Sequence, residues 1–210
     1  MYKVNESLAD ASFELGRCKA FTPGWLENES IWLHMEYKYL LELIRNGMYK
    51  EFIEDFKTCA VCFLDPDIYG RSPLENSSFI ASSANPNPNL HGRGFVARLS
   101  GSTAEFIDMY QTMMFGKSIF TYSDSEGLIF APKPLIPEYL IGDDLKIRAK
   151  LLGTVTVTYK LPARKDYIPG QYSVTGITLD GKLYVGSYIT GDDVEAIRSG
   201  LVKSIEITLG

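Results

Sequence analysis

Apolar residues recur at helical spacing in the first half of the chain. A helix is predicted to end at Asn46-Gly47, because glycine there adopts the left-handed conformation that closes a helix. A second helix is predicted over 52–63 and a third over 103–115, ending at Gly116. The link between the first two is short and predicts an antiparallel pair. The first helix carries its apolar residues mostly on one face: Ile31, Met35, Leu40, Leu41 and Ile44.

Beyond about Phe115 the pattern changes to alternation and to short β-branched runs such as "TVTVTYKL" and "KSIEITLG". These runs predict strands, and Asp180-Gly181 predicts a hairpin turn between two of them. A short helix over 193–199 interrupts the strands, with Asp192 as its expected N-cap. The pattern therefore predicts an α+β fold, with helices up to about Phe115 and mainly strands beyond it.

A loop of unusual length, residues 64–101, joins the second and third predicted helices and is rich in Asn, Pro, Ser and Gly. Its embedded aromatic residues, among them Tyr69, Phe79 and Phe95, predict an ordered loop, because a disordered linker rarely carries so many anchors. Amide and hydroxyl groups suit sugar hydroxyls and phosphate, but they also suit a loop that bonds to itself. Its cations are Arg71, His91, Arg93 and Arg98.

Composition narrows the classes of function. The net charge of −5 and the lack of a Lys/Arg cluster argue against binding to nucleic acid or to an anionic membrane. The sequence lacks a signal-peptide pattern and an apolar run of membrane-span length, so we expect a cytoplasmic protein. Three cysteines do not predict a disulfide framework, and Cys59 and Cys62 form an isolated pair that does not predict a metal site.

Four segments in this order resemble the C-terminal part of cellobiose phosphorylases and related glycoside phosphorylases. They are "WLENESIWLH", the Asn/Ser-rich loop, "LSGSTAEF" and "GLIFAPKPLIP", and the resemblance spans roughly 21–137. It implies that residues 1–117 are the last helical hairpins of an α/α barrel and that residues 118–210 form a small antiparallel β domain. It also implies inverting phosphorolysis of a β-linked oligosaccharide such as cellobiose, with inorganic phosphate as co-substrate and no other cofactor.

The resemblance also implies roles for individual residues. In that family a glutamate seven residues before a phosphate-binding histidine lies near the acceptor sugar, and Glu27 and His34 match this pair. The chain departs from the family at Glu29-Ser30, where two glycines are usual. The implied phosphate contacts are His34, Ser100, Gly101, Ser102 and Thr103.

Candidate contacts to the sugar come from the same segments and the loop. Trp25, Trp32 and Tyr69 are candidate sugar platforms by residue type, although aromatic residues at helical spacing are more often core residues. No residue matches the general acid of the family, so the chain is expected to lack that acid on its own and to be completed by an upstream segment or by self-association. The candidates are Glu27, Trp25, Tyr69 and Arg71.

Simpler interpretations stay open. Ser102 and Glu105 form the pattern of a helix-capping box, which explains the turn without an anion. His34 fits a hydrogen-bonded core histidine, and Glu27 fits a solvated charge at a helix start. Three functions therefore remain: part of a phosphorylase site, a non-catalytic carbohydrate-binding module, or a structural module.

Overall fold

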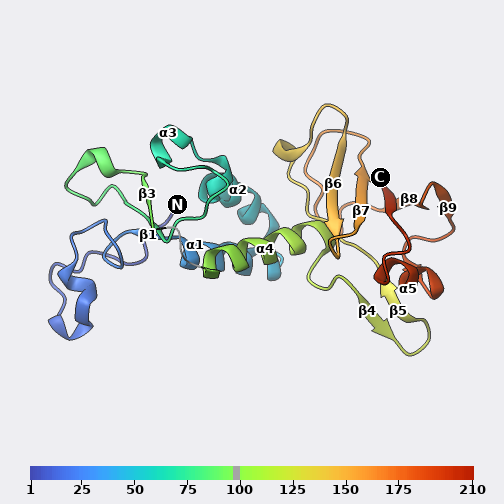
Figure 1. Ribbon diagram of the computed structural model, residues 1–210, viewed down its shortest axis with the longest axis horizontal. Coiled ribbons are helices and arrows are strands. Elements are labelled where there is room, and N and C mark those ends of the chain that lie inside the picture. The colour runs from blue at the N-terminus through green and yellow to red at the C-terminus, as the bar shows by residue number, and fades with distance from the viewer. Residues whose placement is uncertain (97–99) are drawn as a thin grey trace. The chain divides into compact units, whose positions relative to one another are not determined.

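The computed structural model describes residues 1–96 and 100–210, which divide into two compact units (Figure 1). Unit 1 is Met1–Met109 and unit 2 is Tyr110–Gly210. The division falls within helix α4 (Ser100–Phe115), whereas the sequence placed the domain boundary at 117/118. Each unit has its own set of buried apolar side chains, as independent cores require.

Two helices of unit 1 follow the predicted pattern. Helices α1 (Leu33–Arg45) and α2 (Tyr49–Cys59) pack against each other across a short link in which Gly47 has a left-handed φ of 77°. Helix α2 ends before the predicted limit of 63, because Ala60 is extended, and a 3-10 turn, η2 (Val61–Phe63), follows. Their shared core consists of Leu33, Tyr37, Leu40, Leu41, Ile44, Phe52, Ile53, Phe56 and Cys59.

A small antiparallel sheet in the order β1-β2-β3 completes unit 1. Strand β1 (Ile31–Trp32) pairs with β2 (Phe79–Ile80), which pairs with β3 (Gly94–Phe95). The first helix therefore begins at Leu33, two residues later than predicted, because Ile31 and Trp32 belong to a strand. The described part of the long loop is ordered, as predicted, and also contains α3 (Pro66–Tyr69) and η3 (Pro88–Leu90).

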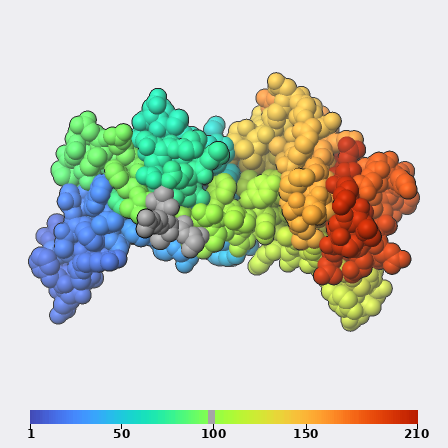
Figure 2. All heavy atoms as spheres, viewed as in Figure 1, coloured from blue at the N-terminus to red at the C-terminus, as the bar shows by residue number. Residues whose placement is uncertain are grey.

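The N-terminal segment packs along the same sheet. It contains the 3-10 helix η1 (Phe13–Ala20), and the main-chain N–H of Val4 donates to the carbonyl of Ser30. Further along, the N–H of Ser82 donates to the carbonyl of Gly24, so the long loop contacts this segment directly. In Figure 2 the two segments form adjoining surface at one end of unit 1. Unit 1 is thus held together by contacts between loops as well as by helices.

Unit 2 contains two sheets, helix α5, the 3-10 helix η4 and the last residues of α4. A three-stranded sheet has the order β10-β5-β4, and a five-stranded sheet has the order β6-β7-β11-β8-β9. The elements are β4 (Thr121–Ser123), β5 (Gly127–Phe130), η4 (Glu138–Leu140), β6 (Lys146–Leu151), β7 (Val155–Lys160), β8 (Val174–Leu179), β9 (Lys182–Tyr184), β10 (Ile189–Thr190), α5 (Asp192–Arg198) and β11 (Ser204–Leu209).

Local signals in unit 2 are confirmed in part. Asp180 and Gly181 both have positive φ and join β8 to β9, as the predicted hairpin requires. Helix α5 begins at Asp192, and Gly191 rather than Asp192 is its N-cap. The larger sheet is mixed and not purely antiparallel, because β11 runs parallel to β7. A parallel neighbour needs a crossover connection, and the chain reaches β11 only after β8, β9, β10 and α5.

The predicted α/α-barrel hairpins are wrong for the described residues. Unit 1 contains one packed pair of helices beside a three-stranded sheet, and no ring of helical hairpins is evident in it. The reason is that aromatic and β-branched residues of the long loop pair as strands with Ile31 and Trp32 instead of forming a further hairpin.

Within the same residues, no helix is both long and apolar enough to cross a bilayer.

Candidate functional site

The candidate site lies where helix α1 meets the first turn of helix α4. His34 is in the first turn of α1 and Gly101 in the first turn of α4. A Cβ added to Gly101 would lie 2.6 Å from both Nδ1 and Cε1 of His34, so only glycine allows this approach. The two segments that the sequence proposed for phosphate binding are therefore in direct contact.

Glu105 holds the other edge of the imidazole. Its Oε1 lies 3.4 Å from Nε2 of His34, and both side chains are partly exposed. A carboxylate at one ring nitrogen fixes the orientation of the ring. Glu105 was expected to cap α4 together with Ser102, but α4 begins at Ser100, which places Ser102 inside the helix, where it is fully buried. The predicted capping box is wrong.

Asn76 lies beside the same turn and is held from behind. The hydroxyl of Tyr37 donates to Asn76 Oδ1 at 3.0 Å and accepts the N–H of Val61 at 3.2 Å. Asn76 Nδ2 lies 3.5 Å from Oγ1 of Thr103, so the amide N–H groups face α4. Burial raises the pKa of Tyr37, which is fully buried, and its hydroxyl therefore stays protonated.

The first turn of α4 carries the remaining predicted phosphate contacts. Ser100, Gly101, Ser102 and Thr103 form this turn, and the first N–H groups of an α-helix generally point out of its N-terminal end. They and the helix dipole attract an anion. Arg98, a cation expected nearby, lies outside the described residues. His34 is thus the basic group that the structure places against this turn.

Glu27 lies in the segment that leads into β1. Its carboxylate pairs with Arg17, and its carbonyl accepts the side-chain amide of Asn5 at 2.7 Å. Next to it, Glu29 is buried, has a left-handed φ of 56° and pairs with Lys3 at 2.8 Å. Glu29 occupies a position where the resembled family has glycine, and its left-handed backbone is the conformation that glycine adopts most easily.

The predicted sugar contacts have different surroundings. Trp25 is half-buried, and the centroid of its ring lies 4.9 Å from that of Phe79 and 4.5 Å from that of Phe95. Tyr69 is fully buried, and in this structure its hydroxyl supports the loop by donating to the carbonyl of Glu75 at 2.8 Å. Arg71 is partly exposed and pairs with Glu75 at 2.7 Å. Of these residues, Trp25 and Arg71 retain surface that a ligand can contact.

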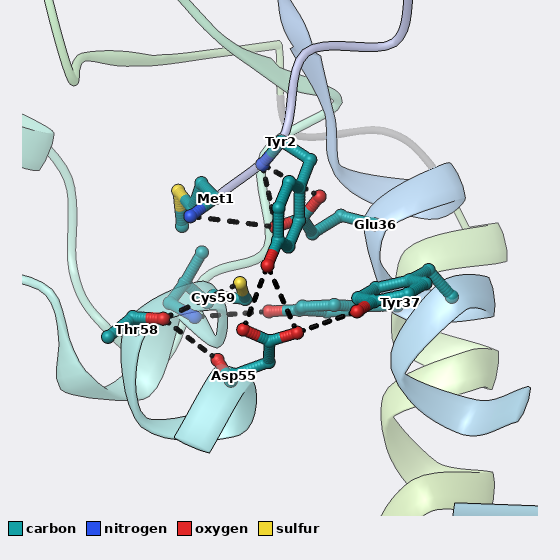
Figure 3. A network of polar contacts seen from close by, with 9 residues as sticks. Met1, Tyr2, Glu36, Tyr37, Asp55, Thr58 and Cys59 are labelled. Atoms are coloured by element: carbon teal, nitrogen blue, oxygen red, sulfur yellow. Dashed lines mark hydrogen bonds and ion pairs between the residues drawn. The ribbon is translucent and has the colours of Figure 1, made fainter. Parts of the chain in front are cut away.

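A second polar cluster lies on a neighbouring part of α1. Figure 3 shows Tyr2 with its main-chain nitrogen toward Glu36 and its hydroxyl toward Asp55. Glu36 is 4% exposed, and burial raises the pKa of its carboxyl. Burial also raises the pKa of the adjacent Cys59 thiol to about 11, so the sulfur stays protonated. The hydroxyl of Tyr39 donates to Asp55 at 2.7 Å.

Sequence analysis missed several residues of these clusters. Glu105 was interpreted as a cap, and Asn76, Tyr37 and Glu36 were not singled out. Gly101, in the first turn of α4, was the sequence signal of a close approach. Side chains from distant segments meet only after the loop folds onto α1, where the N–H of Leu33 donates to the carbonyl of Ser78.

Comparisons with known proteins add no relative to this description. Neither protein-family models nor curated proteins give a match for the chain. Among the described residues, no group of three or more His, Cys, Asp or Glu side chains is arranged to hold a metal ion. The chemistry of the candidate site therefore has to be argued from its own groups.

Proposed function

We propose that this chain supplies the phosphate-binding side of a glycoside phosphorylase site that acts on a β-linked oligosaccharide. One observation carries the proposal: the imidazole of His34 packs on Gly101 at the N-terminal turn of α4. An imidazole and a helix N-terminus together provide a cation and main-chain N–H donors, which is the combination that an oxyanion needs.

In this reaction a phosphate oxygen attacks the anomeric carbon, the glycosidic C–O bond breaks, and the departing sugar oxygen takes a proton. The first turn of α4 would bind the non-attacking oxygens and His34 would contribute positive charge. Glu105 would keep the ring in place. The proposal assigns no general acid to this chain, so it concerns binding and orientation of phosphate and not the proton transfer.

Phosphate titration followed by amide NMR tests the proposal. We expect shifts at residues 100–105 and at His34 in the millimolar range, because one helix N-terminus contributes only about 0.3–1 kcal/mol. His34→Ala should weaken binding by at least about tenfold, since charge-assisted hydrogen bonds are the strong ones. Sodium chloride at matched ionic strength separates phosphate binding from general screening.

The chain offers a matched control. His91 is the only other histidine, and its Nε2 lies 2.7 Å from the carbonyl oxygen of Asn85 within the long loop. His91→Ala should leave phosphate binding unchanged. Absence of shifts at millimolar phosphate, or equal loss in His34→Ala and His91→Ala, would contradict the proposal and leave His34 as a packing residue.

A further inference from the structure

A pocket of about 480 Å³ opens on unit 1 beside helix α1, and its lining includes none of the residues of the proposed phosphate site. Trp32, Met35 and Tyr39 line it at positions that recur along one face of the helix and its approach. Tyr2, Lys3 and Val4 line it from the N-terminal segment, and Glu36 contributes a buried carboxylate. Its volume is within the range of about 300–1,000 Å³ that small-molecule sites occupy.

The aromatic rings of this pocket are held in fixed orientations. Tyr2 and Tyr39 meet edge to face at 5.3 Å, and the hydroxyls of both donate to Asp55. Trp32 is parallel to Phe79 at 6.1 Å between ring centroids. Because the hydroxyls are engaged away from the pocket, these side chains offer mainly ring surface to a ligand. Rings that are already oriented lose little conformational entropy on binding.

The polar groups of the pocket include both acceptors and donors. The Glu36 carboxylate accepts the main-chain N–H of Tyr2 at 3.1 Å and lies 4.0 Å from the amino group of Met1. Lys3 is an ammonium donor paired with Glu29 at 2.8 Å. An ammonium has three N–H bonds and a carboxylate about four acceptor positions, so each retains capacity for a further partner.

We infer that this pocket binds a neutral saccharide. A hexose ring presents C–H faces that stack on aromatic rings, and its hydroxyls both donate to carboxylates and accept from ammonium groups. An anionic ligand would meet the Glu36 carboxylate, which lines the pocket, and the ammonium of Lys3 is already paired with Glu29. A purely apolar ligand would bury the Glu36 carboxylate further without giving it a donor, which is unfavourable. The inference does not depend on the proposed phosphate site, because the two use different residues.

Cellobiose is the probe, observed by saturation-transfer NMR on the intact chain. We expect binding in the millimolar range, with Tyr39→Leu weakening it by about tenfold because a stacking ring is lost. Tyr39→Phe keeps the ring and should stay within about threefold of the parent chain. Tyr39 is 41% exposed, so neither change removes a core residue. Tyr122→Leu, at a 72% exposed tyrosine of unit 2, is the matched control and should have no effect.

Three outcomes overturn the inference. Cellobiose binding that is lost in Glu27→Gln or Arg71→Ala but unchanged in Tyr39→Leu would place the sugar elsewhere. Binding of choline without binding of cellobiose would identify a cation site in the aromatic pocket. No cellobiose binding at tens of millimolar would leave no saccharide site. Phosphate shifts lost in His34→Ala report on the proposed function separately, so either idea can fail alone.

Discussion

Buried polar side chains are distributed unevenly between the two units. Among the described residues, all the buried Asn, Ser and Glu side chains lie in unit 1, and Thr112 alone lies in unit 2. Strands of unit 2 bury an apolar face that includes Val157, Tyr159 and Ile205. A buried polar group is costly unless it is hydrogen-bonded, so a fold retains such groups where they hold a shape that apolar packing does not specify. The difference indicates that polar side chains help to shape the core of unit 1, whereas the core of unit 2 consists mainly of apolar packing.

The largest expected effect is at a glycine of β3. A Cβ on Gly94 would lie 2.2 Å from the Tyr69 ring and 2.9 Å from Oγ of Ser77. Gly94→Ala should lower the free energy of unfolding of unit 1 by about 3 kcal/mol, because a packed ring must move. Both tryptophans, Trp25 and Trp32, belong to unit 1, so tryptophan fluorescence in a denaturant titration reports on this unit.

A strand glycine of unit 2 is the control for that change. A Cβ on Gly176 in β8 would come no closer than 3.9 Å to Thr208, an ordinary contact. Gly176→Ala should change the stability of unit 2 by less than about 0.5 kcal/mol. Equal losses of stability in Gly94→Ala and Gly176→Ala would contradict the claim that the long loop of unit 1 is packed more closely than the strands of unit 2.

Buried hydroxyls in unit 1 allow a second comparison, with an intermediate effect. The hydroxyl of Tyr69 donates to the carbonyl of Glu75 and accepts the N–H of Ser77 at 2.9 Å. Tyr69→Phe leaves both groups without this partner and should cost about 1–3 kcal/mol. Oγ of Ser77 has no partner among the described residues, so Ser77→Ala should be neutral or slightly stabilising. Thermal unfolding of both variants, followed by tryptophan fluorescence, checks this order.

The sequence patterns predicted where helices and strands lie better than they predicted which of these elements contact one another. The alternation in β7 and β11 and the turn at Asp180-Gly181 are local signals, and they located the strands of unit 2 correctly. The strands of unit 1 have two residues each, which is too short for a periodic pattern to be visible. The parallel pairing of β11 with β7 also has no local signal, since it depends on which strand β11 meets after the crossover.

The candidate site was predictable only in part. His34 and Gly101 were proposed together because of the resemblance, and their contact is a property of the folded chain. The interaction of Glu105 with His34 could not be separated from a capping box, because the same spacing serves both. Glu36 was not identified because a glutamate within an amphipathic helix is usually exposed, and its burial depends on Tyr2, a residue far away in the sequence.

Gly101→Ala should have a smaller effect on stability, and the sign of this effect should depend on whether the His34 side chain is present. The comparison tests whether the His34 ring contacts Gly101. In the parent chain Gly101→Ala forces the imidazole away and should destabilise unit 1 by about 1 kcal/mol. In the His34→Ala background the clash is absent, and alanine should stabilise helix α4 by up to about 1 kcal/mol over glycine. Denaturant titration of the double-mutant cycle measures this coupling. Additive effects would show that the ring and Gly101 are not in contact.

The smallest expected effect concerns pH, and its direction differs between the units. Burial raises the pKa of Glu36 in folded unit 1. The contribution of Glu36 to stability is therefore greatest below the ordinary glutamate pKa of about 4.3. It falls as the pH rises through the raised pKa. In unit 2 the main-chain N–H groups of Ser204 and Lys203 lower the pKa of Asp180. Its contribution is present above about 3.9 and is lost as pH falls through the lowered value.

Amide exchange measured on the folded chain between pH 3 and pH 7 separates the two responses, because each amide reports on its own unit. Glu36→Gln should remove a component of the stability of unit 1 that increases toward acid. Asp180→Asn should remove a component of the stability of unit 2 that decreases toward acid. The amide variants cannot ionise, so each pair isolates one carboxyl group. If Glu36→Gln instead makes unit 1 more stable in acid relative to neutral pH, the fold favours the ionised carboxylate and does not raise the pKa of Glu36.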